Sequence, residues 1–496
     1  MELLVILIIA LGTFFTRIIN LLKIPIFTDE AIYIRWAQIG LADPAHRYIS
    51  LTDGKQPLLI WLMYPMLKIF SDPLFAGRFV SVLSGIFTVI GMYFLTRELF
   101  GKKEAILASL IYIFSPFTLL YDRLALYDSL LAGFGVWSLY LSVLLVRKNR
   151  LDVALLLGIT TGLGVLTKSS ALFFLFLLPF SLFLFDFKAE DRVKKLFILM
   201  GLSLISFVIA QIMYNSLRLS PWFYIIRQKN YSFVLTFSEF LKKPFELFMP
   251  NLHGLVPILF TYLTIPILLV IIYGLVRGIL TRDKKILYLF FWFVIPYLAL
   301  AAIGKVIFPR FILFMVIPLF VIASKSILDI TSKFGKNNKL MLITVLFILT
   351  YPIYQSVLLI YNPVDAEIPI SDKNQLFNDW PSGYGAKEVI NFINEKAMKE
   401  KVVLGTEGTF GLNPAVYEIY LKSNKNIDIR SYWPVGEVPK DLLESSKGYP
   451  TYLVFKETQN IPGNWPLKLI AKYRRGKGDT FLLFYQVESR DKNSLK

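Results

Sequence analysis

The chain contains no cysteine and only two histidines among its 496 residues. The absence of cysteine excludes disulfides, thiolate catalysis and cysteine-ligated metals. Acidic residues are also few, with 35 Asp and Glu against 53 Lys and Arg, for a formal net charge of +18. Apolar residues, in contrast, make up 55% of the chain and aromatic residues 16%. This composition is far from that of a soluble domain and indicates a polytopic helical membrane protein.

Hydropathy predicts about eleven transmembrane helices before residue 360, because about 20 apolar residues cross a bilayer core of about 30 Å. We expect them near 3–22, 78–97, 105–121, 128–146, 153–167, 170–186, 196–217, 255–276, 286–303, 308–325 and 339–360. The first segment lacks a basic flank and a small-residue cleavage site, so we expect a retained helix rather than a signal peptide.

The positive charge gathers in short connectors, which argues against nucleic-acid binding. These connectors lie near 97–103, 147–150, 188–195, 277–285 and 325–339. If the helices alternate in direction, all five connectors share one side of the membrane, and the positive-inside rule assigns that side to the cytoplasm. An odd number of spans then predicts a cytoplasmic N-terminus and an extracytoplasmic C-terminal domain.

Two domains are expected: a transmembrane catalytic domain over 1–360 and a small extracytoplasmic α/β domain over 361–496. The second shows helical patterns near 386–399 and 415–423 and strand patterns near 401–405, 451–455, 467–473 and 481–487. The first external connection, 23–77, is expected to carry interfacial helices near 31–37 and 58–70.

Asp29 and Glu30 stand side by side after the first apolar segment. A carboxylate at a membrane boundary must be solvated, paired or put to chemical use, since burying it in hydrocarbon costs several kcal/mol. It could draw a proton from a hydroxyl group or hold a divalent cation. The alternative is that Thr28, Asp29 or Glu30 caps an interfacial helix.

Lys55 is a single cation where the chain returns to the membrane, and lysine is a point-charge partner for phosphate. The alternative is a snorkelling lysine at the membrane edge. Asp128 opens a later helix and could orient Lys55, an acceptor or a cation, or simply stabilise the helix dipole. Asp122 and Arg123 could pair with each other as a structural contact.

Other external side chains are weaker candidates. Lys168, Lys305 and Arg310 could serve an anionic ligand, although each alone is typical of a boundary anchor. In the C-terminal segment three tryptophans could stack on sugar faces or belong to a core: Trp380, Trp433 and Trp465.

In combination, these positions resemble the GT-C membrane glycosyltransferases, in particular the branch with protein O-mannosyltransferases and the aminoarabinose transferase of lipid A. The resemblance covers about residues 1–320. Its motifs are Asp-Glu-Ala-x-Tyr at 29–33, Lys-x-Pro-Leu at 55–58, Gly77-Arg78 with Leu99-Phe100-Gly101, Ser115-Pro116, Ala125-Leu126-x-Asp128, and Gly162-Leu163-Gly164-x-Leu166-Thr167-Lys168. Members are multi-spanning enzymes that pass a sugar from a polyprenyl-phosphate carrier to an acceptor outside the cytoplasm.

The resemblance implies a role for each of these residues. Asp29 is similar in place to the catalytic base, Lys55 to the lysine on the donor phosphate, and Asp128 to the second acid. Beyond the resemblance, our own hypothesis adds Glu30 to the catalytic set, adds Lys168, Lys305 and Arg310 to the phosphate-binding set, and expects Tyr33, Arg78, Asp122 and Arg123 to support the site.

One position departs from the aminoarabinose branch, which has a glutamate of its metal site immediately before the lysine. Here that residue is Gly54. The resemblance therefore requires no cofactor, and a divalent cation stays an open expectation.

The expected function is inverting transfer of a hexosyl or pentosyl group from a polyprenyl-phosphate donor to a hydroxyl of a lipid, protein or glycan. The alternative is a transporter or flippase of lipid-linked sugars, which often has internal repeats and ionisable residues at mid-membrane. No repeat is evident and the acids lie at one external edge, which favours the enzyme. A non-catalytic scaffold would leave the combination of Asp29, Lys55 and Asp128 unexplained.

Overall fold

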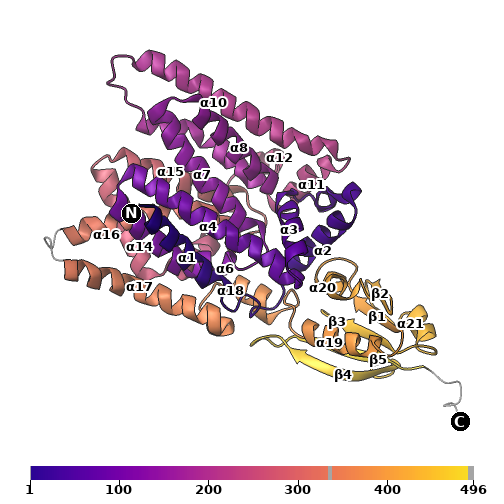
Figure 1. The fold of residues 1–496 in the computed structure, drawn as a ribbon. Coiled ribbons are helices and arrows are strands. Elements are labelled where there is room, and N and C mark those ends of the chain that lie inside the picture. The colour runs from indigo at the N-terminus through magenta and orange to yellow at the C-terminus, as the bar shows by residue number, and fades with distance from the viewer. Residues whose placement is uncertain (1, 333–337, 490–496) are drawn as a thin grey trace, which may run out of the picture. The chain divides into compact units, whose positions relative to one another are not determined.

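A computed structural model describes residues 2–332 and 338–489 of the chain (Figure 1). The chain forms two compact units, each assembled from separate stretches of sequence. The helical unit comprises residues 1–21, 45–62 and 78–369, and the mixed unit comprises residues 22–44, 63–77 and 370–496. The start of the first external connection is thus part of the unit that contains the C-terminal sheet.

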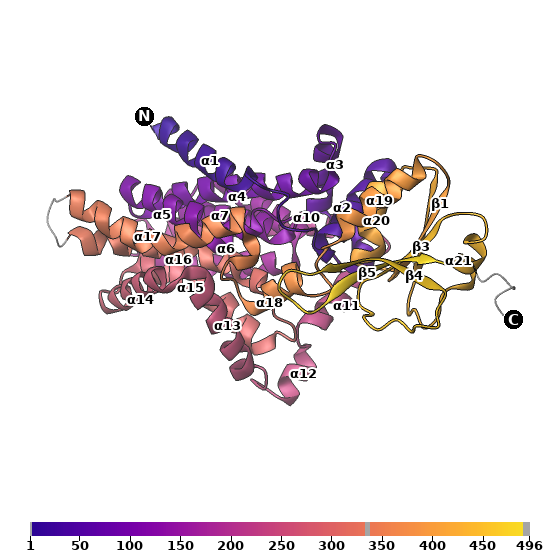
Figure 2. The same ribbon diagram turned by 90° about the horizontal axis from the view of Figure 1, so that it is seen from below.

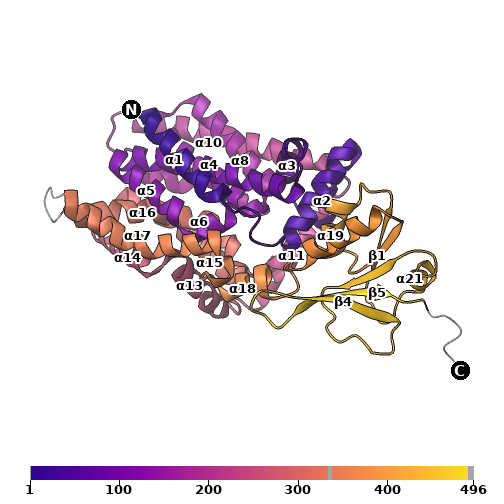
Figure 3. The ribbon, with the colours of Figure 1, turned by 60° about the horizontal axis from the view of Figure 1, so that its bottom comes forward.

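The helical unit contains most of the predicted spans as helices. In the described residues, six helices are long and apolar enough to cross a membrane, or seven with one bent pair. Its main helices are α1 (Glu2–Ile18), α4 (Pro73–Leu99), α5 (Lys102–Phe114), α6 (Pro116–Tyr121), α7 (Tyr127–Lys148), α8 (Leu151–Thr167), α10 (Arg192–Asn215), α11 (Phe223–Phe233), α12 (Phe237–Lys242), α13 (Phe248–Leu263), α14 (Ile265–Leu280), α15 (Lys284–Ile303), α16 (Leu313–Ser332) and α17 (Asn338–Tyr361). Helix α8 packs between α7 and α10 (Figure 1), and α16 contacts α5 and α17 (Figure 3).

Three predicted spans are wrong as single straight helices. The span near 105–121 divides into α5 and α6 at Ser115, whose extended ψ of 124° is the conformation favoured before a proline. The span near 255–276 divides at Thr264 into α13 and α14, which are bent by 109°. The span near 170–186 consists of three short helices, η3 (Ser169–Ala171), α9 (Leu172–Phe176) and η4 (Leu178–Leu184).

The five basic connectors lie together at one end of the helical unit. Arg147 pairs with Glu98 at 2.7 Å, and Asn149 donates to the Lys195 carbonyl at 3.1 Å. On the other side, Lys285 donates to the Leu99 carbonyl at 2.6 Å, and Arg277 pairs with Asp329 at 2.6 Å. These contacts join all five connectors, as an alternating set of helices requires; residues 333–337 of the last one lie outside the described part of the chain.

The mixed unit is built on a five-stranded sheet in the order β2-β1-β3-β5-β4. Its strands are β1 (Val402–Glu407), β2 (Ile427–Tyr432), β3 (Thr451–Phe455), β4 (Leu467–Arg474) and β5 (Phe481–Val487). Strand β1 pairs in parallel with β2 and β3, whereas β5 is antiparallel to β3 and β4. The sequence predicted the other four strands but missed β2 and the short helix α21 (Lys440–Ser445).

Helices cover both faces of this sheet. Tyr452 of β3 contacts Phe392 of α19 (Ala386–Ala397), with ring centroids 5.4 Å apart. The next residue, Leu453, packs in a cluster with Leu442 of α21. Because successive strand residues point to opposite faces, α19 and α21 lie on opposite sides of the sheet. Figure 2 shows the sheet almost edge-on with α19 and α20 (Leu412–Leu421) on one side.

Helix α2 (Thr28–Ala42) packs against α20 within the same unit (Figure 2). Arg35 pairs with Glu418 at 2.8 Å, and Gln38 donates to the Ile419 carbonyl at 3.0 Å. Before α2, Phe27 forms an antiparallel bridge with Ser382. The helix predicted near 31–37 is confirmed, and it is anchored to a domain more than 340 residues away in the sequence.

Candidate active site

Asp128 is the centre of a group of cations in the helical unit. It lies in the first turn of α7, and its side chain is 4% exposed. Lys168, which caps the C-terminus of α8, places Nζ 2.7 Å from Asp128 Oδ1. Arg310, in the 3-10 turn η6 (Pro309–Ile312), places Nε 3.9 Å from Asp128 Oδ2. One buried carboxylate therefore holds two cations from different helix ends.

Two phenylalanine rings connect Lys55 to this group. Lys168 Nζ lies 4.4 Å from the centroid of Phe311, and Lys55 Nζ lies 5.0 Å from that of Phe233. The two ring centroids are 6.1 Å apart. Lys55, Lys168, Arg310 and Asp128 are called the cation cluster below. It combines three positive side chains with one carboxylate, an arrangement suited to an anionic ligand.

The loop that carries Lys55 is held on two sides. Gln56, which is 3% exposed, donates to Ser169 Oγ at 2.6 Å, one residue after Lys168. Asn230 of α11 donates to the same hydroxyl at 3.2 Å. Asp53 pairs with Lys229 of α11 at 2.5 Å. These bonds place the Lys55 backbone between α11 and the end of α8.

Gly54 is required by the shape of this loop. Its φ of +68° is in the left-handed region, and a Cβ there would lie 2.5 Å from Lys229 Cβ and 2.9 Å from the Ile225 carbonyl oxygen. The glutamate of the aminoarabinose branch therefore does not fit without displacement of α11. The described residues hold no group of three or more His, Asp or Glu side chains arranged to bind a metal ion.

A glutamate introduced at Gly54 is expected to destabilise the fold rather than restore a metal site. The strained backbone and the overlap with Lys229 are expected to cost about 2–4 kcal/mol. Equilibrium unfolding in detergent of Gly54→Glu beside Gly436→Glu measures this cost, because a Cβ at Gly436 meets nothing within 4 Å. Equal stability of the two variants would contradict the packing argument.

Lys305 has different partners from the other predicted phosphate ligands. Its ammonium pairs with Glu239 at 2.9 Å and donates to the Tyr231 carbonyl at 3.1 Å. Hydrogen bonds from the Thr236 backbone and from Lys305 lower the pKa of Glu239 to about 2. The structure thus brings Lys168 and Arg310 to Asp128, whereas Lys305 pairs with Glu239 of α12.

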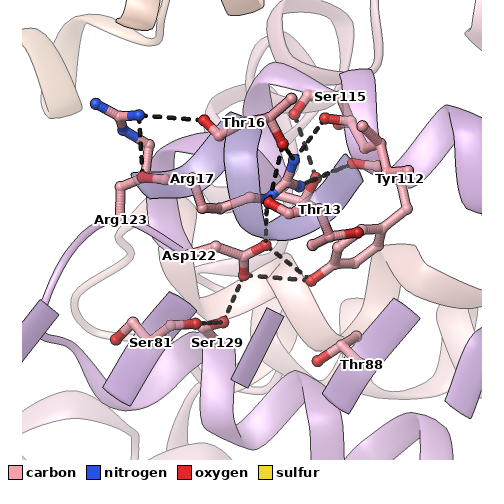
Figure 4. Close-up of polar contacts among 12 residues, drawn as sticks. Thr13, Thr16, Arg17, Ser81, Thr88, Tyr112, Ser115, Asp122, Arg123 and Ser129 are labelled. Atoms are coloured by element: carbon pink, nitrogen blue, oxygen red, sulfur yellow. Dashed lines mark hydrogen bonds and ion pairs between the residues drawn. The ribbon is translucent and has the colours of Figure 1, made fainter. Parts of the chain in front are cut away.

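Asp122 is at the centre of a fully buried polar network (Figure 4). Its carboxylate accepts from Arg17 Nε at 3.1 Å, the Tyr112 hydroxyl at 3.0 Å and Ser129 Oγ at 2.5 Å. The expected pair of Asp122 with Arg123 is wrong, because Arg123 donates to main-chain carbonyls instead. Those carbonyls belong to Thr16, Arg17, Ile19 and Asn20.

The network ties the end of α1 to the start of α7, next to Asp128. Arg78, also fully buried, donates to the Leu21 carbonyl at 2.8 Å and so holds the same end of the first span. Arg17 was not among the predicted site residues, although a cation inside an otherwise apolar span indicates a buried partner. Asp122, Arg123 and Arg78 support the architecture around the cation cluster.

Asp29, Glu30 and Tyr33 belong to the mixed unit. Glu30 is fully buried and accepts from the Phe27 N–H at 2.9 Å, which is the capping role that the sequence left open. Tyr33 is 4% exposed, with its ring 5.8 Å from that of Trp36. Asp29 is half-buried in the first turn of α2. Of the two neighbouring acids, Asp29 is therefore the more exposed one.

Comparisons with known proteins agree with this architecture. Residues 54–214 match the family described as dolichyl-phosphate-mannose-protein mannosyltransferase. The fold is similar to ArnT from Cupriavidus metallidurans, with a TM-score of 0.55, 15% identity and 97% of both chains covered. A second ArnT structure, bound to undecaprenyl phosphate, gives a TM-score of 0.54 at 13% identity, again with 97% of both chains covered.

The oligosaccharyltransferase of Archaeoglobus fulgidus, in complex with Zn and sulfate, has a TM-score of 0.51 at 15% identity. The match covers 91% of this chain and 67% of that one. No curated protein matches the chain by sequence. The likeness to these structures concerns the fold, and the family match is limited to residues 54–214. The predicted resemblance is confirmed: the chain is a membrane protein with the fold of the GT-C glycosyltransferases, and its residues 54–214 carry the pattern of the dolichyl-phosphate-mannose-protein mannosyltransferases.

Proposed function

We propose that this protein transfers a sugar from a polyprenyl-phosphate donor to an acceptor hydroxyl, with inversion at the anomeric carbon. The observation that carries the proposal is the cation cluster, in which Lys168 and Arg310 contact the buried Asp128 carboxylate and Lys55 is linked to them through the Phe233 and Phe311 rings. The match to a family named for a dolichyl-phosphate sugar supports the same donor class. The structures of ArnT with undecaprenyl phosphate and of the archaeal AglB with dolichol-phosphate and an inhibitory peptide are consistent with it.

The cluster would act on the leaving group. As the bond between the anomeric carbon and the phosphate oxygen breaks, negative charge grows on the phosphate. Lys55, Lys168 and Arg310 would neutralise that charge, and fixed cations in a site poor in water are an effective way to lower such a barrier. Asp128 would hold Lys168 and Arg310 in position. This division of roles requires no metal ion. It is in keeping with the poor fit of a glutamate side chain at position 54.

Asp29 would supply the base. Its carboxylate would take the proton from the acceptor hydroxyl while the oxygen attacks the anomeric carbon on the face opposite the phosphate, which inverts the configuration. The start of α2 is rigid, because Glu30 caps it and the Thr28 N–H donates to the Pro381 carbonyl at 3.0 Å. Asp29 thus stands on a fixed helix end.

The same architecture supports an extracytoplasmic site. Asp128 begins α7 and Arg147 lies in its last turn, so the cation cluster and the basic connectors are about 30 Å apart along one helix. The positive-inside rule assigns the connectors to the cytoplasm. The cation cluster would then lie at the outer face, where the lipid-linked donor is used.

The test is transfer by the purified full chain in lipid, with a panel of radiolabelled polyprenyl-phosphate sugars and a crude envelope extract as acceptor source. Release of label from one carrier to the extract identifies the donor and supports the enzyme. If every donor keeps its label while binding tightly and crossing the bilayer, the protein is a transporter and the proposal fails.

Replacing Lys55 with methionine is expected to raise the KM for the donor about 10- to 100-fold, since one charged contact to the phosphate is lost. The fold should be preserved, because hydrogen bonds of Gln56 and the ion pair of Asp53 hold the loop. Lys243→Met is the matched control, as Lys243 is 70% exposed and pairs with Glu246. An unchanged donor KM in Lys55→Met would remove Lys55 from the phosphate site.

A further inference from the structure

The mixed unit has its own position for a ligand. Strand β1 leads through α20 to β2 on one side, and the chain then returns to β3 on the other side of β1. In open sheets with parallel strands, ligands bind outside the carboxyl ends of the strands at such a reversal of strand order. Here these ends are Glu407 of β1, Tyr432 of β2 and Phe455 of β3.

A lysine lies buried between two tryptophans at this edge. Lys456, directly after β3, is 4% exposed, and its Nζ is 4.3 Å from the ring centroid of Trp380 and 5.8 Å from that of Trp433. Nζ also pairs with Glu457 at 2.9 Å. Buried lysines are rare unless paired, and stacking on aromatic faces compensates part of the desolvation. The lysine therefore fixes both indole rings.

The backbone beneath the rings is rigid as well. Glu407 is 1% exposed and accepts the N–H groups of Lys456 and Glu457, each at 2.7 Å. Gly408 has a φ of +110°, and a Cβ there would lie 3.1 Å from Lys456 Cε. A platform of this kind is organised before any ligand arrives, which lowers the entropic cost of binding.

Large aromatic side chains at this edge remain exposed. Trp433 is 54% exposed and Phe410, in the loop after β1, is 55% exposed. The ring of Phe410 lies 6.2 Å from that of Trp36 in α2. The exposed rings offer flat apolar faces to a ligand. Glu457, whose side chain is half-exposed, adds a hydrogen-bond acceptor beside them.

Asp29 is adjacent to this edge within the same unit. Thr28 donates to the carbonyl of Pro381, the residue after Trp380, at 2.9 Å. A Cβ at Gly411 would lie 3.6 Å from Thr28 Cγ2. The residue before Asp29 thus touches both the tryptophan segment and the loop that carries Phe410.

From this arrangement we infer that the carboxyl edge of the sheet is the acceptor site and that the acceptor is a saccharide. A sugar ring has an apolar C–H face that stacks on an indole and hydroxyl groups that a carboxylate recognises. The indole of Trp433 would stack on the face of the sugar ring, with Trp380 beside it. A free hydroxyl of the same glycan would then lie next to Asp29. The inference deepens the proposed function, on which it rests, by naming the class of acceptor.

The binding test is independent of turnover. Saturation-transfer NMR on the full chain in detergent uses methyl glycosides of glucose, galactose, mannose and arabinose as probes, at millimolar concentration. Ring C–H signals of at least one probe are expected with the wild type and with Asp29→Asn, and about tenfold less signal with Trp433→Ala. Trp433 is exposed, so its loss should leave the fold intact.

The matched control is Tyr449→Ala, because Tyr449 is 47% exposed and precedes β3 at the opposite edge of the same sheet. Sugar signals that survive unchanged in Trp433→Ala, or that are absent for every probe in the wild type, overturn the acceptor site. If a short peptide binds at this edge and the sugars do not, the assignment of a saccharide as the acceptor is wrong. Because donor turnover is measured separately, failure here leaves the proposed transferase standing, whereas failure of donor turnover with intact sugar binding leaves a saccharide-binding site and overturns its role as an acceptor site.

Discussion

Asp29→Asn is expected to lower kcat for sugar transfer by about 10²- to 10⁴-fold, the usual contribution of a positioned general base. Asparagine keeps the size and the hydrogen-bonding shape of the side chain but cannot accept the proton of the acceptor hydroxyl. Binding of the donor phosphate, which the proposal assigns to Lys55, Lys168 and Arg310, should change little. The measurement is transfer of label from the polyprenyl-phosphate donor, with donor affinity determined in parallel.

Asp43→Asn is the matched control for this experiment, since Asp43 caps the other end of α2 and is exposed. It should transfer sugar as the wild type does. If Asp29→Asn retains near-native transfer in a well-folded protein, the base is not Asp29. A donor KM that rises while kcat stays constant would instead indicate that Asp29 positions the donor and takes no proton.

Asp122→Asn is expected to cost about 3–5 kcal/mol of folding stability, the typical effect of removing one partner of a buried ion pair. Arg17 is fully buried and would lose its 3.1 Å partner while Arg78 and Arg123 remain buried nearby. The amide can still accept from Tyr112 or Ser129, so the loss comes from the uncompensated guanidinium. Equilibrium unfolding in detergent measures the change.

The control for this prediction is Asp152→Asn, whose pair with Arg150 is exposed and should contribute little. The double variant Arg17→Met with Asp122→Leu removes both charges and should recover most of the lost stability. A single variant as stable as the wild type would show that the buried pair does not hold α1 to α7.

Much of the fold followed from local patterns. Apolar length predicted the long helices, such as α7 and α10, because crossing hydrocarbon demands it. Short strand patterns between helical patterns predicted β1 and β3 to β5. Strand β2 was missed because, unlike the fully buried β1 and β3, it is a partly exposed edge strand that carries two charged residues, Asp428 and Arg430. The breaks at Ser115 and Thr264 were missed because a hydropathy window averages over a turn.

For the candidate site, the residue types and the order of motifs were enough to select Asp29, Lys55 and Asp128 as candidates. Tertiary structure decided their partners. Lys168 and Arg310 meet Asp128 across 40 and 182 positions of sequence, whereas Lys305 is held by Glu239. Gly54 excludes a side chain only because α11 packs against it.

The anchoring of α2 on α20 and the burial of Lys456 between two tryptophans were equally invisible in the sequence. Periodicity predicts which residues are buried, because residues three or four positions apart lie on the same face of a helix. Which charge pairs with which depends on how distant elements pack, since desolvation and Coulomb attraction act through space and not along the chain. The sequence by itself therefore determined the membrane helices, the α/β domain and the candidate acids and cations, and only the tertiary structure decided which of them act together.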